Sequence, residues 1–190
     1  MRVIAGQYRS RPLQSLPGMD IRPTSDRLRE TLFNVVTAGN PEPMQGTVWL
    51  DLFAGTGAVG IEALSRGAAK VYFVESSFKA AGLIEKNLKT LGVGEGFEIV
   101  RSEVVGAVHR LGAREVSTGF VFLDPPYRMQ DAYAETLEAL GKSPLVGAST
   151  VVIAEHEKRF DSGERFGKIE RYRKLVQGDA ALSFYRMSDL

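Results

Sequence analysis

Short apolar runs alternate with amphipathic segments along most of the chain, starting near residue 47. Five runs have the length and composition of buried strands, and we expect these strands at 48–53, 71–74, 97–100, 120–123 and 151–154. Between them apolar residues recur at helical spacing, which predicts helices at 60–66, 78–91, 104–111 and 131–140. Continuous apolar strands joined by such helices indicate an α/β fold with a parallel sheet covered on both faces.

The alternation changes near the C-terminus. Residues 169–176 and 181–186 have the pattern of strands, but no helical segment separates them. The intervening Gln177-Gly178-Asp179 is typical of a turn. The sequence therefore predicts a terminal antiparallel hairpin that completes a mixed seven-stranded sheet.

The N-terminal forty residues have a different character. Residues 1–15 alternate loosely and predict a short β-hairpin. Residues 23–26 can begin a helix, with Thr24 or Ser25 as its cap. Residues 38–46 are rich in Gly and Pro, as linkers are. We therefore expect a hairpin-and-helix extension in 1–40 and a core domain in 41–190.

Composition narrows the possible chemistry. The 190 residues suffice for one domain with a full core, and no apolar run is long enough to span a bilayer. The chain contains no Cys, which excludes disulfides, a thiolate metal site and a covalent cysteine intermediate. We expect His109 and His156 to be structural or surface residues, and we expect no metal. The first residues lack the apolar stretch of a secretory signal, so we expect a cytoplasmic protein.

Charge is unevenly distributed although the net charge is only +1. The first thirty residues hold six arginines against three acidic residues. A basic arm of this kind can bind nucleic-acid phosphates. The alternative interpretation is an exposed hairpin whose basic face contacts only solvent. The candidate RNA-binding residues are Arg2, Tyr8, Arg9, Arg11 and Arg22.

A glycine-rich turn follows the first predicted strand of the core. Residues 55–60 match G-x-G-x-x-G between a strand and a helix, which suits a dinucleotide or the adenosine and amino-acid tail of S-adenosylmethionine. Asp51 precedes the turn, where a carboxylate opposes a pyrophosphate but suits the cationic S-adenosylmethionine. Glu75 lies 20 residues beyond the first glycine and can accept both ribose hydroxyls of either cofactor. The candidate cofactor-binding residues are Asp51, Phe53, Gly55, Gly57, Glu75, Ser76, Ser102, Glu103 and Asp124.

A second motif, Asp124-Pro125-Pro126-Tyr127, ends the fourth predicted strand. The Asp124 carboxylate and the Pro125 carbonyl can accept the two N–H groups of a planar exocyclic amine, which favours a more nucleophilic, pyramidal nitrogen. The prolines stiffen this backbone, and the Tyr127 ring can stack on a flat base. The four residues are therefore candidate catalytic residues, although an Asp-Pro-Pro turn after a buried strand is an alternative.

With these motifs the chain resembles the bacterial RsmD family, which methylates guanine N2 in small-subunit (16S) ribosomal RNA. The resemblance covers nearly the whole length. It implies a Rossmann-like fold, S-adenosylmethionine as cofactor, a catalytic domain in 41–190 and a guanine held by Asp124 to Tyr127. Glu103 departs from the family, in which Asp or Asn is more usual. Besides the two motifs, the resemblance rests on Arg2-Val3-Ile4-Ala5-Gly6, Arg22-Pro23-Thr24-Ser25-Asp26-Arg27-Leu28-Arg29-Glu30 and Gly178-Asp179-Ala180-Ala181-Leu182-Ser183-Phe184-Tyr185.

Other functions remain open at this point. An adenine-N6 DNA methyltransferase would use the same clamp, but such enzymes commonly carry a target-recognition region, and no segment here is large enough. A protein-glutamine methyltransferase would be expected to carry Asn in place of Asp124. A nicotinamide-dependent oxidoreductase leaves residues 124–127 unexplained, and a non-catalytic RNA-binding module explains the basic arm but neither motif. We expect a monomer whose partner is ribosomal RNA within an assembled small subunit, with no membrane contact.

Overall fold

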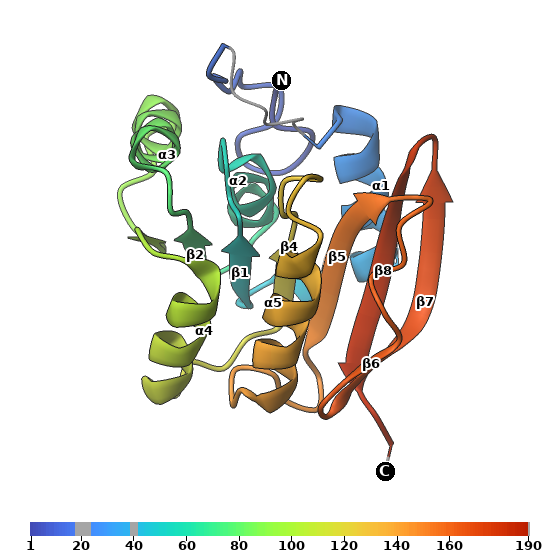
Figure 1. Ribbon diagram of the computed structural model, residues 1–190. Helices are drawn as coiled ribbons and strands as arrows, with labels where there is room; N and C mark the ends of the chain where they lie inside the picture. Colours follow the sequence, from blue (N-terminus) through green and yellow to red (C-terminus); the bar gives the residue numbers. More distant parts are fainter. Residues whose placement is uncertain (18–23, 39–41, 190) are drawn as a thin grey trace.

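The computed structural model describes residues 1–17, 24–38 and 42–189 (Figure 1). Within these residues eight strands form one mixed sheet in the order β3-β2-β1-β4-β5-β8-β7-β6. The first five strands are parallel, and β8 runs antiparallel between β5 and β7. The strands are β1 (Val48–Leu52), β2 (Lys70–Val74), β3 (Phe97–Val100), β4 (Phe120–Leu123), β5 (Val151–Glu157), β6 (Arg165–Phe166), β7 (Ile169–Gln177) and β8 (Ala180–Met187).

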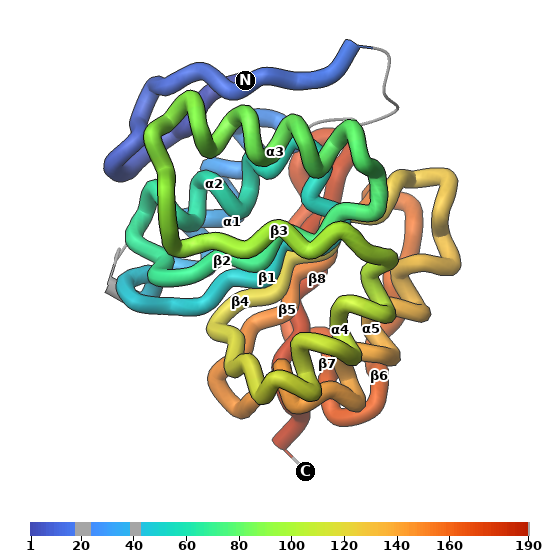
Figure 2. Tube along the Cα trace, turned by 90° about the vertical axis from the view of Figure 1, so that its left-hand side faces the viewer, coloured from blue at the N-terminus to red at the C-terminus, as the bar shows by residue number. Residues whose placement is uncertain are grey.

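Helices cover both faces of the sheet (Figure 2). One face carries α1 (Asp26–Thr37), α2 (Ala58–Ser65) and α3 (Phe78–Leu91), and the other carries α4 (Val104–Ala113) and α5 (Asp131–Lys142). Two apolar cores result, because the alternating side chains of each strand point to opposite faces. A short 3-10 helix, Glu42–Met44, precedes β1.

The sequence prediction of seven strands was wrong by one strand. The additional strand, β6, has two residues, and it pairs Arg165 with Glu170 and Phe166 with Ile169. Two residues are too few to show a strand pattern in the sequence. Three helices also extend beyond the ranges that we predicted: α2 begins at Ala58, α4 ends at Ala113 and α5 ends at Lys142.

The predicted N-terminal hairpin is present only as a loop with one isolated bridge, between Arg2 and Pro12. Backbone hydrogen bonds join Val3 to Arg11 and Leu13 to Met1. Val3 and Leu13 are buried in the core that also holds α1 and β1, so the loop packs directly on the sheet domain.

A buried carboxylate fixes this loop to α2. Glu62 is fully buried and accepts hydrogen bonds from the backbone amides of Ile4 (2.8 Å) and Ala5 (2.9 Å). It also forms ion pairs with Arg66 (2.8 Å) and with the buried Arg29 (3.7 Å). A buried charge is tolerated only when it is paired and hydrogen-bonded, and these four contacts meet that requirement.

Gly6 allows the loop to approach α2 closely. Its φ is +81°, and a Cβ atom at this position would lie 1.9 Å from the carbonyl oxygen of Ser65. A side chain is therefore excluded here. The same serine contacts the loop again, because its hydroxyl accepts from the amide of Tyr8 and donates to the carbonyl of Ala5.

Candidate active site

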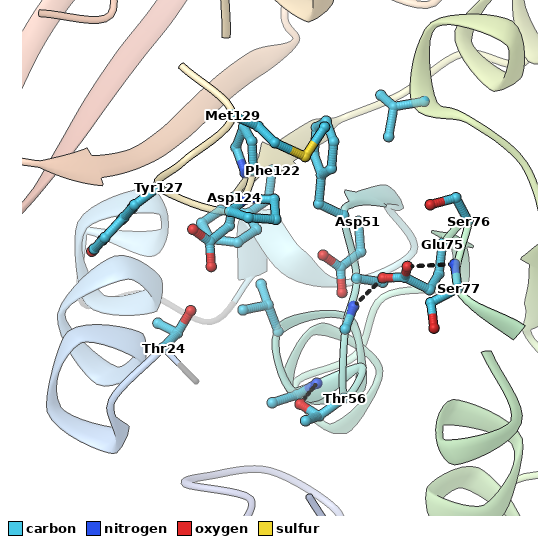
Figure 3. Close-up of a pocket in the computed structure, with 18 of the residues that line it drawn as sticks. Thr24, Asp51, Thr56, Glu75, Ser76, Ser77, Phe122, Asp124, Tyr127 and Met129 are labelled. Carbon is cyan, nitrogen blue, oxygen red and sulfur yellow. Dashed lines mark hydrogen bonds between the residues drawn. The ribbon is translucent and has the colours of Figure 1, made fainter. Parts of the chain in front are cut away.

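A cavity of about 980 Å³ opens at the carboxyl ends of the parallel strands (Figure 3). Its walls come from the segments that follow β1, β2 and β4 and from the start of α4. The strand order reverses between β1 and β4, and this switch point is where open α/β sheets bind ligands. The lining residues include Asp51, Phe53, Gly55, Glu75, Ser76, Glu103 and the whole of Asp124 to Tyr127.

The first two glycines of the glycine-rich turn have left-handed backbone angles. Gly55 and Gly57 have φ values of +57° and +79°, in the region that favours glycine. Phe53 also has a positive φ, +58°, which is rare for an aromatic residue and marks stored backbone strain at the cavity wall. Gly57 does not line the cavity; it caps α2 beneath the turn, where a Cβ would lie 3.2 Å from Ile84.

Asp51 lines the cavity and also contacts the backbone of α2. Its side chain is 1% exposed, and its Oδ2 accepts a hydrogen bond from the amide of Gly60 at 2.9 Å. Burial raises the pKa of Asp51 well above its ordinary value, which favours the protonated form. A cationic ligand beside this carboxyl would lower the pKa again, as a ligand with a sulfonium and an ammonium does.

The Glu75 side chain binds two backbone amides of residues that line the cavity. One carboxylate oxygen accepts from the Gly55 amide (2.8 Å), and the other accepts from the Ser77 amide (2.9 Å), as Figure 3 shows. The carboxylate therefore positions both the glycine-rich turn and the start of α3. Each oxygen keeps one further acceptor position, which leaves two for a pair of ribose hydroxyls.

The remaining cofactor candidates lie around the same end of the cavity. Glu103 lines it and is the N-cap of α4, where its side chain makes no capping hydrogen bond. Ser76 also lines the cavity and is exposed. Ser102 is not a lining residue, and its hydroxyl donates to the Glu103 carbonyl at 2.9 Å.

The residues of the second motif form the opposite end of the cavity. Asp124, Pro126 and Tyr127 are half-buried, whereas Pro125 is buried. The Pro126 carbonyl accepts from the Met129 amide at 2.7 Å, which closes a tight turn. In Figure 3, Asp124 lies between Tyr127 and Asp51. The structure thus brings both sequence motifs to one cavity.

Thr24 is a lining residue that the site prediction missed. It is buried, and its hydroxyl donates to the Glu155 carboxylate at 2.7 Å. The two residues are 131 positions apart in the sequence. The backbone carbonyl of Glu155 accepts from the hydroxyl of Tyr133, also at 2.7 Å. Burial, together with the nearby Asp124, raises the pKa of Tyr133, so this phenol stays protonated. Thr24 lies within 22–30, a segment on which the family resemblance rests, and this was the sequence feature that could have indicated it.

Of the predicted RNA-binding residues, the four that the structure describes do not line the cavity. Arg2 and Arg9 are exposed, Tyr8 packs partly against the core, and Arg11 donates to the Thr90 carbonyl at 3.0 Å. Arg22 lies outside the described residues. The N-terminal loop lies at the same end of the molecule as the carboxyl ends of β1 and β2 (Figure 1).

The histidines have ordinary surroundings. His109 is exposed, whereas His156 is fully buried and its ring nitrogens bond to the Glu157 carbonyl and the Ser183 hydroxyl. In the part of the chain that the structure describes, no cluster of three or more potential metal ligands occurs. No helix in residues 1–17, 24–38 or 42–189 is long and apolar enough to cross a membrane.

The fold and the site together define the class of S-adenosylmethionine-dependent methyltransferases. Within it, the chain belongs to the family described as conserved hypothetical protein 95, whose model matches residues 1–186. The family resemblance seen in the sequence is thereby confirmed.

Individual relatives agree with this assignment. The Escherichia coli protein named ribosomal RNA small subunit methyltransferase D is 32% identical, over 98% of this chain and 89% of its own length. A protein of the same name from Haemophilus influenzae is 35% identical, over 83% of this chain and 79% of its own length. The solved structure of Escherichia coli yhhF superposes with a TM-score of 0.84 at 30% identity, covering 100% and 99% of the two chains.

Proposed function

We propose that this protein transfers a methyl group from S-adenosylmethionine to the exocyclic N2 of a guanine in small-subunit ribosomal RNA. Its relatives are named for ribosomal RNA methylation, which supports the substrate class. The observation that carries the proposal is the meeting of two motifs in one cavity. The glycine-rich turn with Glu75 forms one end, and Asp124 to Tyr127 forms the other.

The cofactor half of the site would bind S-adenosylmethionine by backbone and carboxylate contacts. Glu75 has two acceptor positions for the ribose hydroxyls, and Gly55 lets the backbone pass close to the ligand. Asp51 supplies a buried carboxyl that a cationic amino-acid tail would hold in its charged form. Glu103 lines the cavity and makes no capping hydrogen bond, and it would accept from the adenine amine.

The target half would hold the base flat and its amine in line with the methyl group. Asp124 and the Pro125 carbonyl accept the two N–H groups, and Tyr127 stacks on the ring. The nitrogen then attacks the methyl carbon as the sulfur–carbon bond breaks, leaving S-adenosylhomocysteine and a cationic nitrogen. That nitrogen loses one proton to Asp124 or to water. Alignment of this kind supplies much of the acceleration.

Recognition of the substrate is expected to involve the N-terminal forty residues. The exposed Arg2 and Arg9 would contact phosphates, which position RNA without reading its sequence. Selectivity would then come from the shape of RNA already bound by ribosomal proteins in the small subunit. The protein would act as a monomer in the cytoplasm.

Asp124→Ala tests the role of the clamp. Loss of one positioned, charged acceptor should lower single-turnover methyl transfer by about 10²–10³-fold, while S-adenosylmethionine still binds. Asp131→Asn, in the first turn of α5, is the matched control because that residue is exposed and outside the cavity. Turnover by Asp124→Ala at the wild-type rate would exclude the clamp.

A further inference from the structure

An unusually exposed aromatic ring stands beside the cavity. Phe78, the first residue of α3, is 76% exposed, more than any other large apolar side chain in the described part of the chain. The guanidinium of Arg101 lies 5.0 Å from the centroid of this ring. Arg101 is itself fixed by Glu85, two turns along α3, with a hydrogen bond of 2.8 Å. A phenyl ring and a planar cation are thus held together at the surface.

The pair lies at the rim of the active-site cavity. Ser76 and Ser77, which directly precede Phe78, line the cavity, and so does Glu103, two residues after Arg101. The two segments meet because β2 and β3 are neighbouring parallel strands that end at the same edge. Phe78 and Arg101 themselves are not lining residues, so a ligand on this pair would lie outside the cofactor pocket.

The chemistry of the pair favours a nucleobase over a phosphate. Glu85 neutralises the charge of Arg101, which weakens its attraction for a phosphate. The Phe78 ring and the Arg101 guanidinium still offer two flat surfaces, and nucleobases stack on aromatic and arginine planes of this kind. A guanine that enters the cavity must leave its own stack, which also deprives its neighbours of a stacking partner.

We infer that Phe78 and Arg101 form a stacking subsite for an RNA base close to the methylated guanine in the substrate. This inference rests on the proposed function and extends it, since it assigns a substrate contact outside the basic N-terminal residues. Stacking is tolerant of base identity, so the subsite orients an unpaired strand without selecting a sequence.

Phe78→Ala tests the inference. Single-turnover methylation should show an apparent RNA Michaelis constant raised about tenfold, within the range for one lost stacking contact, with an unchanged S-adenosylmethionine dissociation constant. Phe78→Trp should restore RNA affinity, because it keeps a flat ring. The melting temperature should stay at the wild-type value, since the side chain is exposed.

A matched control exists on the other side of the molecule. Tyr172 on β7 is 44% exposed, and the guanidinium of Arg186 lies 4.9 Å from its ring, but β7 is near the sheet edge opposite β3. Tyr172→Ala should leave the RNA Michaelis constant unchanged.

Three results would overturn the subsite: an unchanged RNA Michaelis constant in Phe78→Ala, an equal rise in Tyr172→Ala, or weaker S-adenosylmethionine binding in Phe78→Ala. The last would assign the ring to the cofactor. If wild-type protein methylates no RNA, the proposed function fails instead. Fluorescence anisotropy with the same RNA then tests the subsite separately, and equal binding by wild type and Phe78→Ala would refute it.

Discussion

Glu75→Gln tests the proposed ribose contact of a side chain that also binds two backbone amides. The Glu75 carboxylate accepts from the amides of Gly55 and Ser77, at 2.8 and 2.9 Å, and keeps one acceptor position on each oxygen. A glutamine of the same size has one oxygen and one amino group. The amino group would face a backbone N–H, so donor would meet donor. One backbone contact and one ribose contact would be lost together.

The expected loss follows from the charge of the acceptor. A hydrogen bond to a charged group contributes about 1.5–3 kcal/mol, so removal of the ribose contact should weaken S-adenosylmethionine roughly 10- to 150-fold. The side chain is half-buried, and water can replace part of the backbone contact, so the melting temperature should fall only slightly. Methyl transfer at saturating cofactor should change much less than affinity does.

Isothermal titration calorimetry with S-adenosylmethionine measures this effect. Glu95→Gln is the control, because Glu95 is an exposed glutamate outside the cavity and should bind the cofactor as wild type does. If Glu75→Gln binds the cofactor within twofold of wild type, the carboxylate does not hold the ribose.

Three further substitutions test how the structure is held together. Gly6→Ala should lower the free energy of unfolding by roughly 2 kcal/mol or more in urea titrations, because its Cβ would collide with the Ser65 carbonyl; Gly82→Ala, with open space, should not. Asn87→Asp should cost about 3 kcal/mol, because the buried Asn87 amide donates to the carbonyls of Gln14 and Thr56; a cost below 1 kcal/mol would refute this role. Burial lowers the pKa of His156 below 6.5, so the unfolded chain takes up the proton first and stability should fall as pH drops from 7 to 5.5, by up to about 1.4 kcal/mol per pH unit. Thermal melts of His156→Gln should show a flatter pH dependence, and an equal slope would assign the acid sensitivity elsewhere.

The order of strands and helices was predictable because hydrophobic periodicity is a local property. Each of the five parallel strands is a short apolar run, and each follows a helical segment or a turn. Strand β6 was not predictable, since two residues carry no periodicity and Phe166 pairs with β7 only through tertiary structure. The N-terminal hairpin was overpredicted because its few apolar residues pack into the core instead of forming a ladder.

The location of the site was predictable from residues that belong to a short sequence motif. Gly55 and the Asp124 motif each lie at a strand end, so the sequence alone places them near each other. The two amides bound by Glu75 were not predictable, because every residue except proline has an amide and the sequence does not show which one is near. Thr24 was missed for a related reason, since its partner Glu155 lies on a distant strand.

The most direct test of the proposed function is the identity of the methylated nucleoside. Small ribosomal subunits without prior methylation, incubated with this protein and labelled S-adenosylmethionine, are digested to nucleosides and separated by chromatography coupled to mass spectrometry. We expect label in N2-methylguanosine from wild-type protein, and a signal reduced about 10²–10³-fold with Asp124→Ala. Label in N6-methyladenosine, or transfer to DNA or protein in place of RNA, would contradict it.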